Sequence, residues 1–562
     1  MGATQSTASP CILDTKKGKL KGVEYKNVDG EPVLQRYTRV PYAQPPVGQL
    51  RWRRPQPLKN FTFSGASDEP GDYTEFGPIC PQPVYNHSAA LLENSEAAPE
   101  IANAEHEDCL YLNIWVPAGT PPSEGWPVQV FIHGGWLQVG DANQSNSYDP
   151  FDLLAHSAKR VIVAPTYRLN IFGFLAGKEL QSAESGEKAP GNYGLWDQRA
   201  ALEWVYANIA FFGGNKNLIT VGGLSAGAHS TWMQLYYDTY LPPELRIIKQ
   251  AYFWSNAITV QPNPSTSDIL TSQWQELVDV LGIKANSPEE KLAELRKVPA
   301  KDIIAAIKKL KMHTFRTSTD DDFVPENFLK TIHDGSFTSK LAGNGVRIVL
   351  GEVKDEALLY KFVNPPNTYS DLVTQVQNYY PKHVVDKLLT LNEIYDIPDK
   401  DEQGQEERFQ NVFARIVADM QVHVPTRGMT KGFLTAEKTP EVLRYRIAWR
   451  AKCLDKWIKP DVGVCHAADN PIWWLSGYRA GFDEEDKKHA DEFLRPFNDF
   501  LEGKPWQQRE WVGVHGAARI DRYLDENGVT HQNVEDESFE NAMKVWDAVA
   551  EVQGMKDSDS AT

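Results

Sequence analysis

The sequence predicts an α/β fold, in which a central, mostly parallel sheet is flanked by helices. Short runs of apolar, β-branched side chains recur along the 562-residue chain, and helical segments separate them. This is typical of parallel strands that are buried on both faces. In the first half of the chain, a turn containing Gly or Asn stands between such a run and the next helical segment. The clearest runs are residues 128–132, 161–164, 218–221, 346–350 and 442–447.

Two longer segments, residues 262–340 and 366–440, are expected to be mainly helical and more polar. One helix start is explicit: Ser287 supplies an N-cap, Pro288 takes the first helical position, and Glu290 follows three residues after the cap. Such insertions after sheet strands either lie over an active site as a roof or simply cover the sheet. The sequence leaves both interpretations open.

Composition and charge favour one globular unit with a small-molecule partner. Residues 15–554 are expected to form a single domain, with flexible segments at 1–14 and 555–562 because both ends are polar and lack a pattern. The net charge of −17 argues against nucleic acid or an anionic membrane surface as a partner, since both require basic patches. The sequence does not determine the oligomeric state.

The sequence has no apolar N-terminal run and no stretch of about 18 apolar residues. We therefore expect a cytoplasmic protein with no signal peptide and no transmembrane segment. Gly2 and Ser6 fit the loose N-myristoylation pattern, but an ordinary polar N-terminus is the favoured interpretation. The cysteines form no CxxC pair and no zinc cluster is visible, so neither a metal nor an organic cofactor is expected.

A GxSxG motif centred on Ser225 lies between the run at 218–221 and an expected helix. A nucleophile at the tip of such a sharp turn has strained backbone geometry, and the residues two positions away on either side must lack side chains. Gly223 and Gly227 meet that need. The amides and the positive dipole end of the following helix point to where negative charge develops in acyl transfer. The motif therefore predicts a nucleophilic serine.

A serine hydroxyl becomes a good nucleophile only when a base removes its proton, and the base needs a carboxylate that fixes its tautomer. In α/β-hydrolase folds these groups follow in the order Ser, acid, His. The sequence provides that order, because acidic residues lie within 351–356, after one apolar run, and His466 follows another. This favours an α/β-hydrolase fold with a catalytic triad.

Longer motifs extend the comparison over nearly the whole chain. They are PYAQPPVG at 41–48, EDCLYLN at 107–113, NYGLWDQ at 192–198 and FFGG at 211–214. In these segments and in their order, the sequence resembles the type-B carboxylesterase/lipase family, which includes the cholinesterases. The resemblance implies an α/β-hydrolase fold and the hydrolysis of carboxylic esters.

The same resemblance implies that Glu356 is the catalytic acid and His466 the base, with Ser225 as nucleophile. Asp355 is the rival acid and His515 the rival base. We prefer His466 because it follows the strand that should carry the catalytic histidine.

By resemblance, the backbone amides of Gly135, Trp136 and Ala226 form the oxyanion hole, which stabilises the negative charge on the substrate carbonyl oxygen. Two positions depart from the family pattern. Trp136 stands where a third glycine is usual, and Leu224 stands where a glutamate usually precedes the serine. We expect the indole either to narrow the acyl pocket or to hold the loop in another conformation, and the missing carboxylate to remove one negative charge from the site.

Other matches to the family are structural. Cys80 and Cys109 correspond to a family disulfide, which a reducing cytosol would disfavour. Arg51 and Glu107 match an ion pair of the scaffold. Ser255 resembles a serine that lies near the acid without taking part in the chemistry.

The sequence thus predicts a serine esterase that acts on a small-molecule ester through an acyl-enzyme intermediate. Two alternatives remain. One is a binding protein that uses a cholinesterase-like scaffold without chemistry, which the presence of all three triad residues disfavours. The other is the same triad acting as an amidase or acyltransferase. Acyl and alcohol specificity are not determined by the sequence.

Overall fold

The structure, a computed structural model, describes residues 7–65, 68–84, 104–143, 148–183, 190–361, 365–400, 404–504 and 516–555. Its strands are β1 (Thr7–Thr15), β2 (Gly18–Lys26), β3 (Pro32–Pro41), β4 (Gly71–Asp72), β5 (Tyr111–Pro117), β6 (Trp126–Ile132), β7 (Val161–Pro165), β8 (Gly214–Leu224), β9 (Gln250–Trp254), β10 (Arg347–Val353), β11 (Glu441–Ile447), β12 (Arg519–Leu524) and β13 (Thr530–Glu535).

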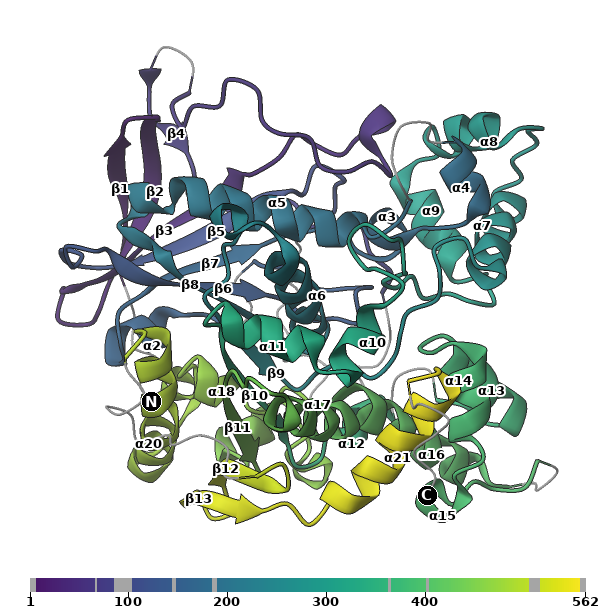
Figure 1. Cartoon of the computed structure of the whole chain (residues 1–562). Helices are drawn as coiled ribbons and strands as arrows, with labels where there is room; N and C mark the ends of the chain where they lie inside the picture. The colour runs from purple at the N-terminus through teal and green to yellow at the C-terminus, as the bar shows by residue number, and fades with distance from the viewer. Residues whose placement is uncertain are drawn as a thin grey trace.

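These strands form one sheet in the order β1-β2-β3-β5-β7-β6-β8-β9-β10-β11-β12-β13, with β4 paired to β2 outside this path (Figure 1). Within the series β7-β6-β8-β9-β10-β11-β12 every pairing is parallel. The pairings β1-β2, β2-β3, β3-β5, β5-β7 and β12-β13 are antiparallel. All five predicted apolar runs lie in parallel strands, which confirms the predicted α/β fold.

The α-helices are α2 (Phe151–His156), α3 (Asn170–Phe174), α4 (Lys178–Ala183), α5 (Tyr193–Asn208), α6 (Ala226–Tyr240), α7 (Asp268–Val280), α8 (Pro288–Leu295), α9 (Ala300–Ile307), α10 (Phe328–His333), α11 (Ser336–Gly343), α12 (Ala357–Tyr360), α13 (Tyr369–Gln377), α14 (Lys382–Leu388), α15 (Asn392–Tyr395), α16 (Glu406–Ala418), α17 (Val424–Thr435), α18 (Asn470–Trp473), α19 (Gly477–Ala480), α20 (Glu484–Leu501) and α21 (Phe539–Val552). A π-helical turn, η5 (Asp419–His423), joins α16 to α17.

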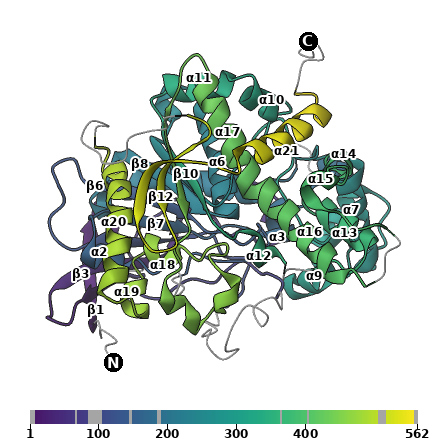
Figure 2. The same ribbon diagram turned by 90° about the horizontal axis from the view of Figure 1, so that it is seen from below.

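The two helical insertions lie together beside the sheet. Helices α7 to α9 come from the first and α13 to α16 from the second, and both groups lie on the right-hand side of Figures 1 and 2. The predicted helix start is confirmed, because the Ser287 side chain accepts from the Glu290 amide and the Glu290 side chain accepts from the Ser287 amide.

Hydrophobic cores lie on both faces of the sheet. Along β6, Val128 and Val130 belong to one core and Phe131 to the other, and along β9 Phe253 and Trp254 divide in the same way. Successive side chains of a strand point to opposite faces, so a strand that is buried on both faces is rich in apolar residues at odd and even positions alike.

The expectation of a flexible segment over residues 1–14 is wrong for residues 7–14. They belong to β1, which pairs antiparallel with β2 in register Thr7 to Lys26 and Thr15 to Gly18. The strand lies at the edge of the sheet and is mostly exposed, so its sequence carries no burial pattern that would predict it. Gly2, in the N-myristoylation pattern, and residues 556–562 of the predicted C-terminal tail lie outside the described residues.

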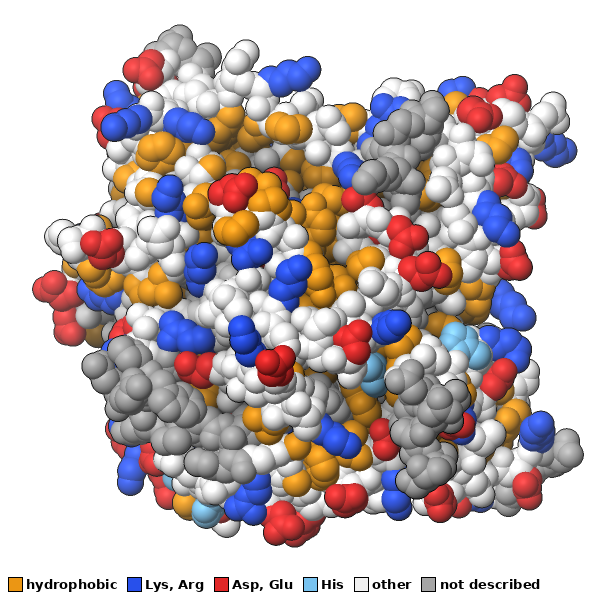
Figure 3. All heavy atoms as spheres, in the orientation of Figure 1, with side chains coloured by type: hydrophobic (Ala, Val, Ile, Leu, Met, Phe, Trp, Pro, Cys, Tyr) orange, Lys and Arg blue, Asp and Glu red, His pale blue; other side chains and the backbone are white. Residues whose placement is uncertain are grey.

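Among the described helices, none combines the length and the apolar character needed to cross a bilayer. On the face shown in Figure 3, Lys and Arg side chains are interspersed with Asp and Glu side chains.

Candidate active site

Ser225 lies at the turn between β8 and α6, where the predicted nucleophile should lie. Its backbone dihedrals are φ 60° and ψ −125°, a combination that costs energy for a residue with a side chain and is typical of strained functional turns. The surrounding elements hold it in place, because the Ser225 amide donates to the Trp254 carbonyl at 2.9 Å and the His229 amide donates to the Ser225 carbonyl at 3.0 Å.

The flanking glycines are required by close backbone approach. A Cβ added to Gly223 would lie 2.3 Å from the carbonyl oxygen of Ile132, and one added to Gly227 would lie 1.9 Å from the same oxygen. Both distances are well inside van der Waals contact. The steric reason that the sequence predicts for these glycines is therefore confirmed, with the end of β6 as the obstacle.

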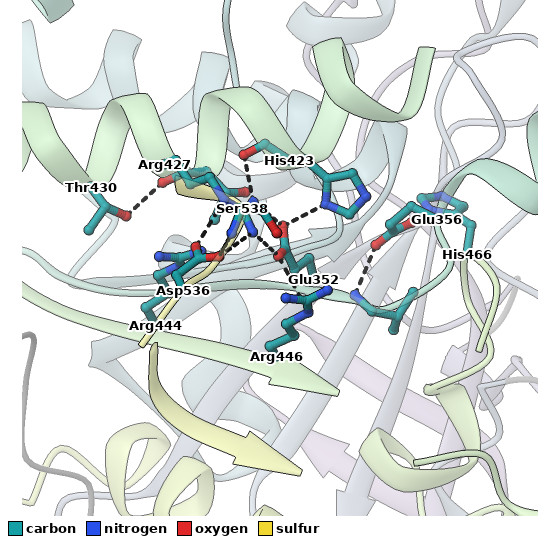
Figure 4. A network of polar contacts seen from close by, with 12 residues as sticks. Glu352, Glu356, His423, Arg427, Thr430, Arg444, Arg446, His466, Asp536 and Ser538 are labelled. Atoms are coloured by element: carbon teal, nitrogen blue, oxygen red, sulfur yellow. Dashed lines mark hydrogen bonds and ion pairs between the residues drawn. The ribbon is translucent and has the colours of Figure 1, made fainter. Parts of the chain in front are cut away.

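Glu356 and His466 come together although they lie far apart in the sequence. Glu356 precedes α12, just after β10, and its Oε2 lies 2.5 Å from the Nδ1 of His466 (Figure 4). The other carboxylate oxygen of Glu356 accepts from the Val353 amide at 3.0 Å. Both side chains are buried, so water does not compete for this contact.

The rival acid does not face the histidine. Asp355 Oδ2 accepts from the Val464 amide at 2.9 Å, and the Asp355 amide donates to the Val464 carbonyl at 3.0 Å. Asp355 thus ties the loop that carries His466 to the end of β10. The rival base, His515, lies outside the described residues.

Tyr360 lies near both His466 and Trp136, and the loop that carries Trp136 approaches Ser225. The ring of Tyr360 lies 5.5 Å from that of His466 and 6.4 Å from that of Trp136. A Cβ added to Gly134, in the same loop as Trp136, would lie 3.1 Å from the Cβ of Ser225. The Nε2 of His466 is buried without a hydrogen-bond partner among the described residues, so its bond to the Ser225 hydroxyl stays a prediction.

The predicted oxyanion residues Gly135 and Trp136 lie in a tight turn after β6. Gly135 and Trp136 have positive φ of 106° and 57°, and a Cβ on Gly135 would lie 1.9 Å from the Val139 carbonyl oxygen. The amides of Gln138 and Val139 both donate to the Gly135 carbonyl, at 2.8 and 3.0 Å. Ala226 is the first residue of α6, where a helix amide has no intrahelical acceptor.

Gln138 supports this loop, and the sequence did not predict that role. Gln138 is buried, and its Nε2 donates to the carbonyls of Trp136 at 3.1 Å and of Phe315 at 2.6 Å, while its Oε1 accepts from the Phe315 amide at 3.0 Å. A glutamine in a glycine-rich loop predicts nothing by itself. Its role depends on the segment around Phe315, which lies 177 positions further along the chain.

A cavity of about 130 Å³ adjoins part of the oxyanion hole that the sequence predicts. Trp136 and Ala226 line it on one side, and the remaining wall comes largely from the helical insertions: residues 258–273, 312–317, 377–381 and 420–421 contribute to it. The insertions therefore line a pocket and do not simply cover the sheet.

The two departures from the family pattern have different surroundings. Trp136 lines the cavity, as expected if the indole narrows the pocket. Leu224 is 7 % exposed and belongs to the same hydrophobic core as Phe131 and Trp254. No described acidic residue lines the cavity.

Other buried groups near the site are paired or neutral. Asp469 accepts from the indole nitrogen of Trp473 at 2.7 Å, and burial raises its pKa to about 6. Burial lowers the pKa of His133 to about 4 and, together with the nearby charge of Arg316, that of His229 to about 4. Both histidines are therefore neutral near pH 7.

Of the expected scaffold features, the Arg51–Glu107 ion pair is present and the Cys80–Cys109 disulfide is not formed. Arg51 Nε donates to Glu107 at 2.6 Å. Cys80 and Cys109 are buried free thiols, and their mutual hydrogen bond together with burial raises the pKa of Cys109 well above its usual range. Ser255 is fully buried, with φ 52°, and its amide donates to the carbonyl of Gly351 in the strand that leads to the acid.

Metal ligands are not clustered in the described part of the chain: it contains no group of three or more His, Cys, Asp or Glu side chains that could hold a metal ion.

The sequence is similar to known proteins over most of its length. A family model described as the carboxylesterase family matches residues 9–546. The chain is 41 % identical to an uncharacterized esterase/lipase of Schizosaccharomyces pombe over 98 % of both chains. It is 37 % identical to a carboxylic ester hydrolase of Gibberella moniliformis, over 95 % of this chain and 94 % of the relative. It is 28 % identical to the cholinesterase of Mus musculus, over 77 % of this chain and 69 % of the relative.

Proposed function

The chain belongs to the carboxylesterase family, and on that premise we propose that it hydrolyses small-molecule carboxylic esters through an acyl-enzyme intermediate on Ser225. Its relatives with 37 to 41 % identity are named as ester hydrolases, and the fold is that of an α/β-hydrolase. Membership of the family supports ester hydrolysis, and we propose the roles of the individual residues.

One observation carries the proposal: the buried 2.5 Å contact between Glu356 Oε2 and His466 Nδ1. A carboxylate in this position fixes the tautomer in which Nδ1 carries the proton, so that Nε2 has a free lone pair. That nitrogen is buried and has no other described partner. An imidazole oriented in this way is suited to accept the proton of the serine hydroxyl.

In the first half of the reaction, Ser225 Oγ attacks the ester carbonyl carbon while His466 Nε2 takes the hydroxyl proton. The negative charge that develops on the carbonyl oxygen is stabilised by the amides of Gly135, Trp136 and Ala226. The tetrahedral intermediate then expels the alcohol, which receives the proton from His466, and the acyl group remains on Ser225.

In the second half, water replaces the alcohol. His466 removes a proton from the water, the hydroxide attacks the acyl carbon, and Ser225 Oγ leaves with the proton that His466 returns. The products are the carboxylic acid and the free enzyme. No step requires a group other than these side chains and amides.

A direct test replaces the nucleophile. Ser225→Ala should abolish hydrolysis of p-nitrophenyl acetate while leaving the unfolding transition unchanged, and unchanged turnover would refute the assignment. A fluorophosphonate probe, which reacts only with an activated serine, should label the wild-type chain at Ser225 and leave the alanine variant unlabelled.

A further inference from the structure

We propose that Arg316 binds an anionic group of the substrate, so that this site prefers esters that carry a second, ionised carboxylate. The proposal rests on the proposed function, because it names the substrate class of the same site. The guanidinium group of Arg316 lies in the wall of the cavity described above.

Arg316 shares a cavity with part of the proposed reaction centre. It lines the cavity that also contains Trp136 and Ala226, two of the proposed oxyanion donors. Its neighbour Thr317 has its hydroxyl 3.0 Å from Nε2 of His229, and the amide of His229 donates to the carbonyl of Ser225. Arg316 therefore belongs to a segment that is tied directly to the nucleophilic turn.

The cavity contains no described counter-ion for this cation. Its described lining includes no Asp, Glu or Lys residue, and His229 is neutral because its pKa is lowered to about 4. No described carboxylate forms an ion pair with Arg316. Arg316 is thus the one charged group among the described residues of the wall.

The guanidinium of Arg316 contacts neutral groups, and one of its nitrogens has no described hydrogen-bond acceptor. The Nε of Arg316 donates to the carbonyl of Asn378 at 2.9 Å, and its Cζ lies 4.1 Å from the ring centroid of Tyr379. Its Nη2 is buried and has no hydrogen-bond partner in the described part of the chain. Leaving a cationic donor buried and unsatisfied is costly, and a carboxylate supplies the missing charge and acceptor.

The same charge acts against cationic esters. A fixed cation, Arg316, lies in the wall of the pocket, and the residue before Ser225 is the uncharged Leu224. Like charges in the same cavity repel each other. We therefore expect the order anionic, neutral, cationic for esters of matched shape.

A bracing role is the competing explanation. Arg316 links the loop around residues 312–317 to Asn378 and Tyr379, and loss of that link could deform the pocket for every substrate. Arg415 offers a matched control, because it also stacks on a tyrosine, Tyr395, at 5.7 Å and donates to a backbone carbonyl, that of Ile394, at 2.6 Å. It does not line this cavity.

The experiment measures kcat/KM for pairs of esters that differ only in a carboxylate or a methyl group. Monoethyl glutarate against ethyl pentanoate tests a charge on the acyl side, and 4-acetoxybutanoate against butyl acetate tests a charge on the alcohol side. In at least one pair, Arg316→Gln should lower the preference for the anionic ester about tenfold or more, mainly through KM. The pair that responds identifies the side of the substrate that Arg316 binds.

The control Arg415→Gln should leave both ratios unchanged, and Arg316→Lys should restore part of the preference. Equal losses for charged and uncharged esters in Arg316→Gln, or ratios that do not change in either pair, would overturn the proposal. Fluorophosphonate labelling of Ser225 in the same variant separates this outcome from failure of the proposed function, because a labelled serine with an unchanged ratio refutes only the role of Arg316.

Discussion

Arg427 binds Glu352 through both of its terminal nitrogens, at 2.9 and 2.8 Å, and both side chains are buried (Figure 4). Arg427 also pairs with Asp536, which in turn pairs with Arg444. Glu352 lies in β10, four residues before Glu356. A buried group of ion pairs therefore joins the strand that leads to the proposed catalytic acid to α17, β11 and the segment after β13.

Removal of one partner from this group should be strongly destabilising. Arg427→Met leaves Glu352 and Asp536 buried without their shared cation, and we expect a loss of about 3 to 5 kcal/mol in the free energy of unfolding. The control Lys382→Met breaks the exposed pair with Asp386 and should cost less than about 1 kcal/mol. Urea unfolding followed by tryptophan fluorescence measures both, and similar small losses would contradict the prediction.

Asp521 should make stability depend on pH. Its Oδ2 accepts from the Arg444 amide at 2.6 Å, but burial raises its pKa from 3.8 to about 7. Because the folded state holds this proton more tightly than the unfolded state, the stabilising effect is complete below pH 3.8 and is lost as pH rises through 7. Asp521→Asn removes this titration.

The measurement for Asp521 is the difference in unfolding free energy between Asp521→Asn and wild type at pH 4, 5, 6, 7 and 8. The difference should shift in favour of the variant as pH rises. A constant difference over this range would show that Asp521 is ionised in the folded protein throughout.

The two neighbouring acids should differ in their effect on turnover. Glu356→Gln removes the carboxylate that orients His466 and should lower kcat by roughly 10³ to 10⁴-fold without unfolding the protein. Asp355→Asn affects a carboxylate that contacts the Val464 amide, and kcat should fall by less than about tenfold. Steady-state kinetics with p-nitrophenyl acetate distinguishes them, and equal losses would contradict the assignment of the acid.

Glycine should be required at 227 for steric reasons. Gly227→Ala puts a Cβ 1.9 Å from the carbonyl oxygen of Ile132, so we expect a lower melting temperature and a loss of activity of more than about 100-fold. Gly343→Ala, in α11, meets no atom within 4 Å and should instead stabilise the protein by about 0.4 to 1 kcal/mol. Thermal unfolding compares the two, and a well-folded, fully active Gly227→Ala would be the contrary result.

Trp136 should limit the size of the acyl group. Trp136→Gly removes the indole from the cavity wall and suits the positive φ of 57°, so kcat/KM for p-nitrophenyl 2-methylpropanoate should rise relative to the acetate. Trp136→Ala opens the same space but keeps a side chain in the left-handed region, at a cost of about 1 kcal/mol or more. Its kcat should therefore be the lower of the two, and an unchanged acyl preference in both variants would contradict the prediction.

Some features could be predicted because their cause is local. The mostly apolar runs identify strands that are buried on both faces, and the glycines around Ser225 identify a turn in which no side chain fits. The edge strand β1 could not be predicted in this way. Its side chains are mostly exposed, and only its backbone pairing with β2 makes it a strand.

The sequence by itself determined the parallel strands of the sheet, the turn that holds Ser225 and the family. Only the tertiary structure decided which of two adjacent carboxylates meets His466, and that Arg316 lines the cavity with no counter-ion among the described residues. The physical reason is that these contacts join segments far apart in the chain: Glu356 and His466 are separated by 110 positions. Local patterns record what a residue needs from its immediate neighbours, whereas the partner that it meets depends on the path of the whole chain.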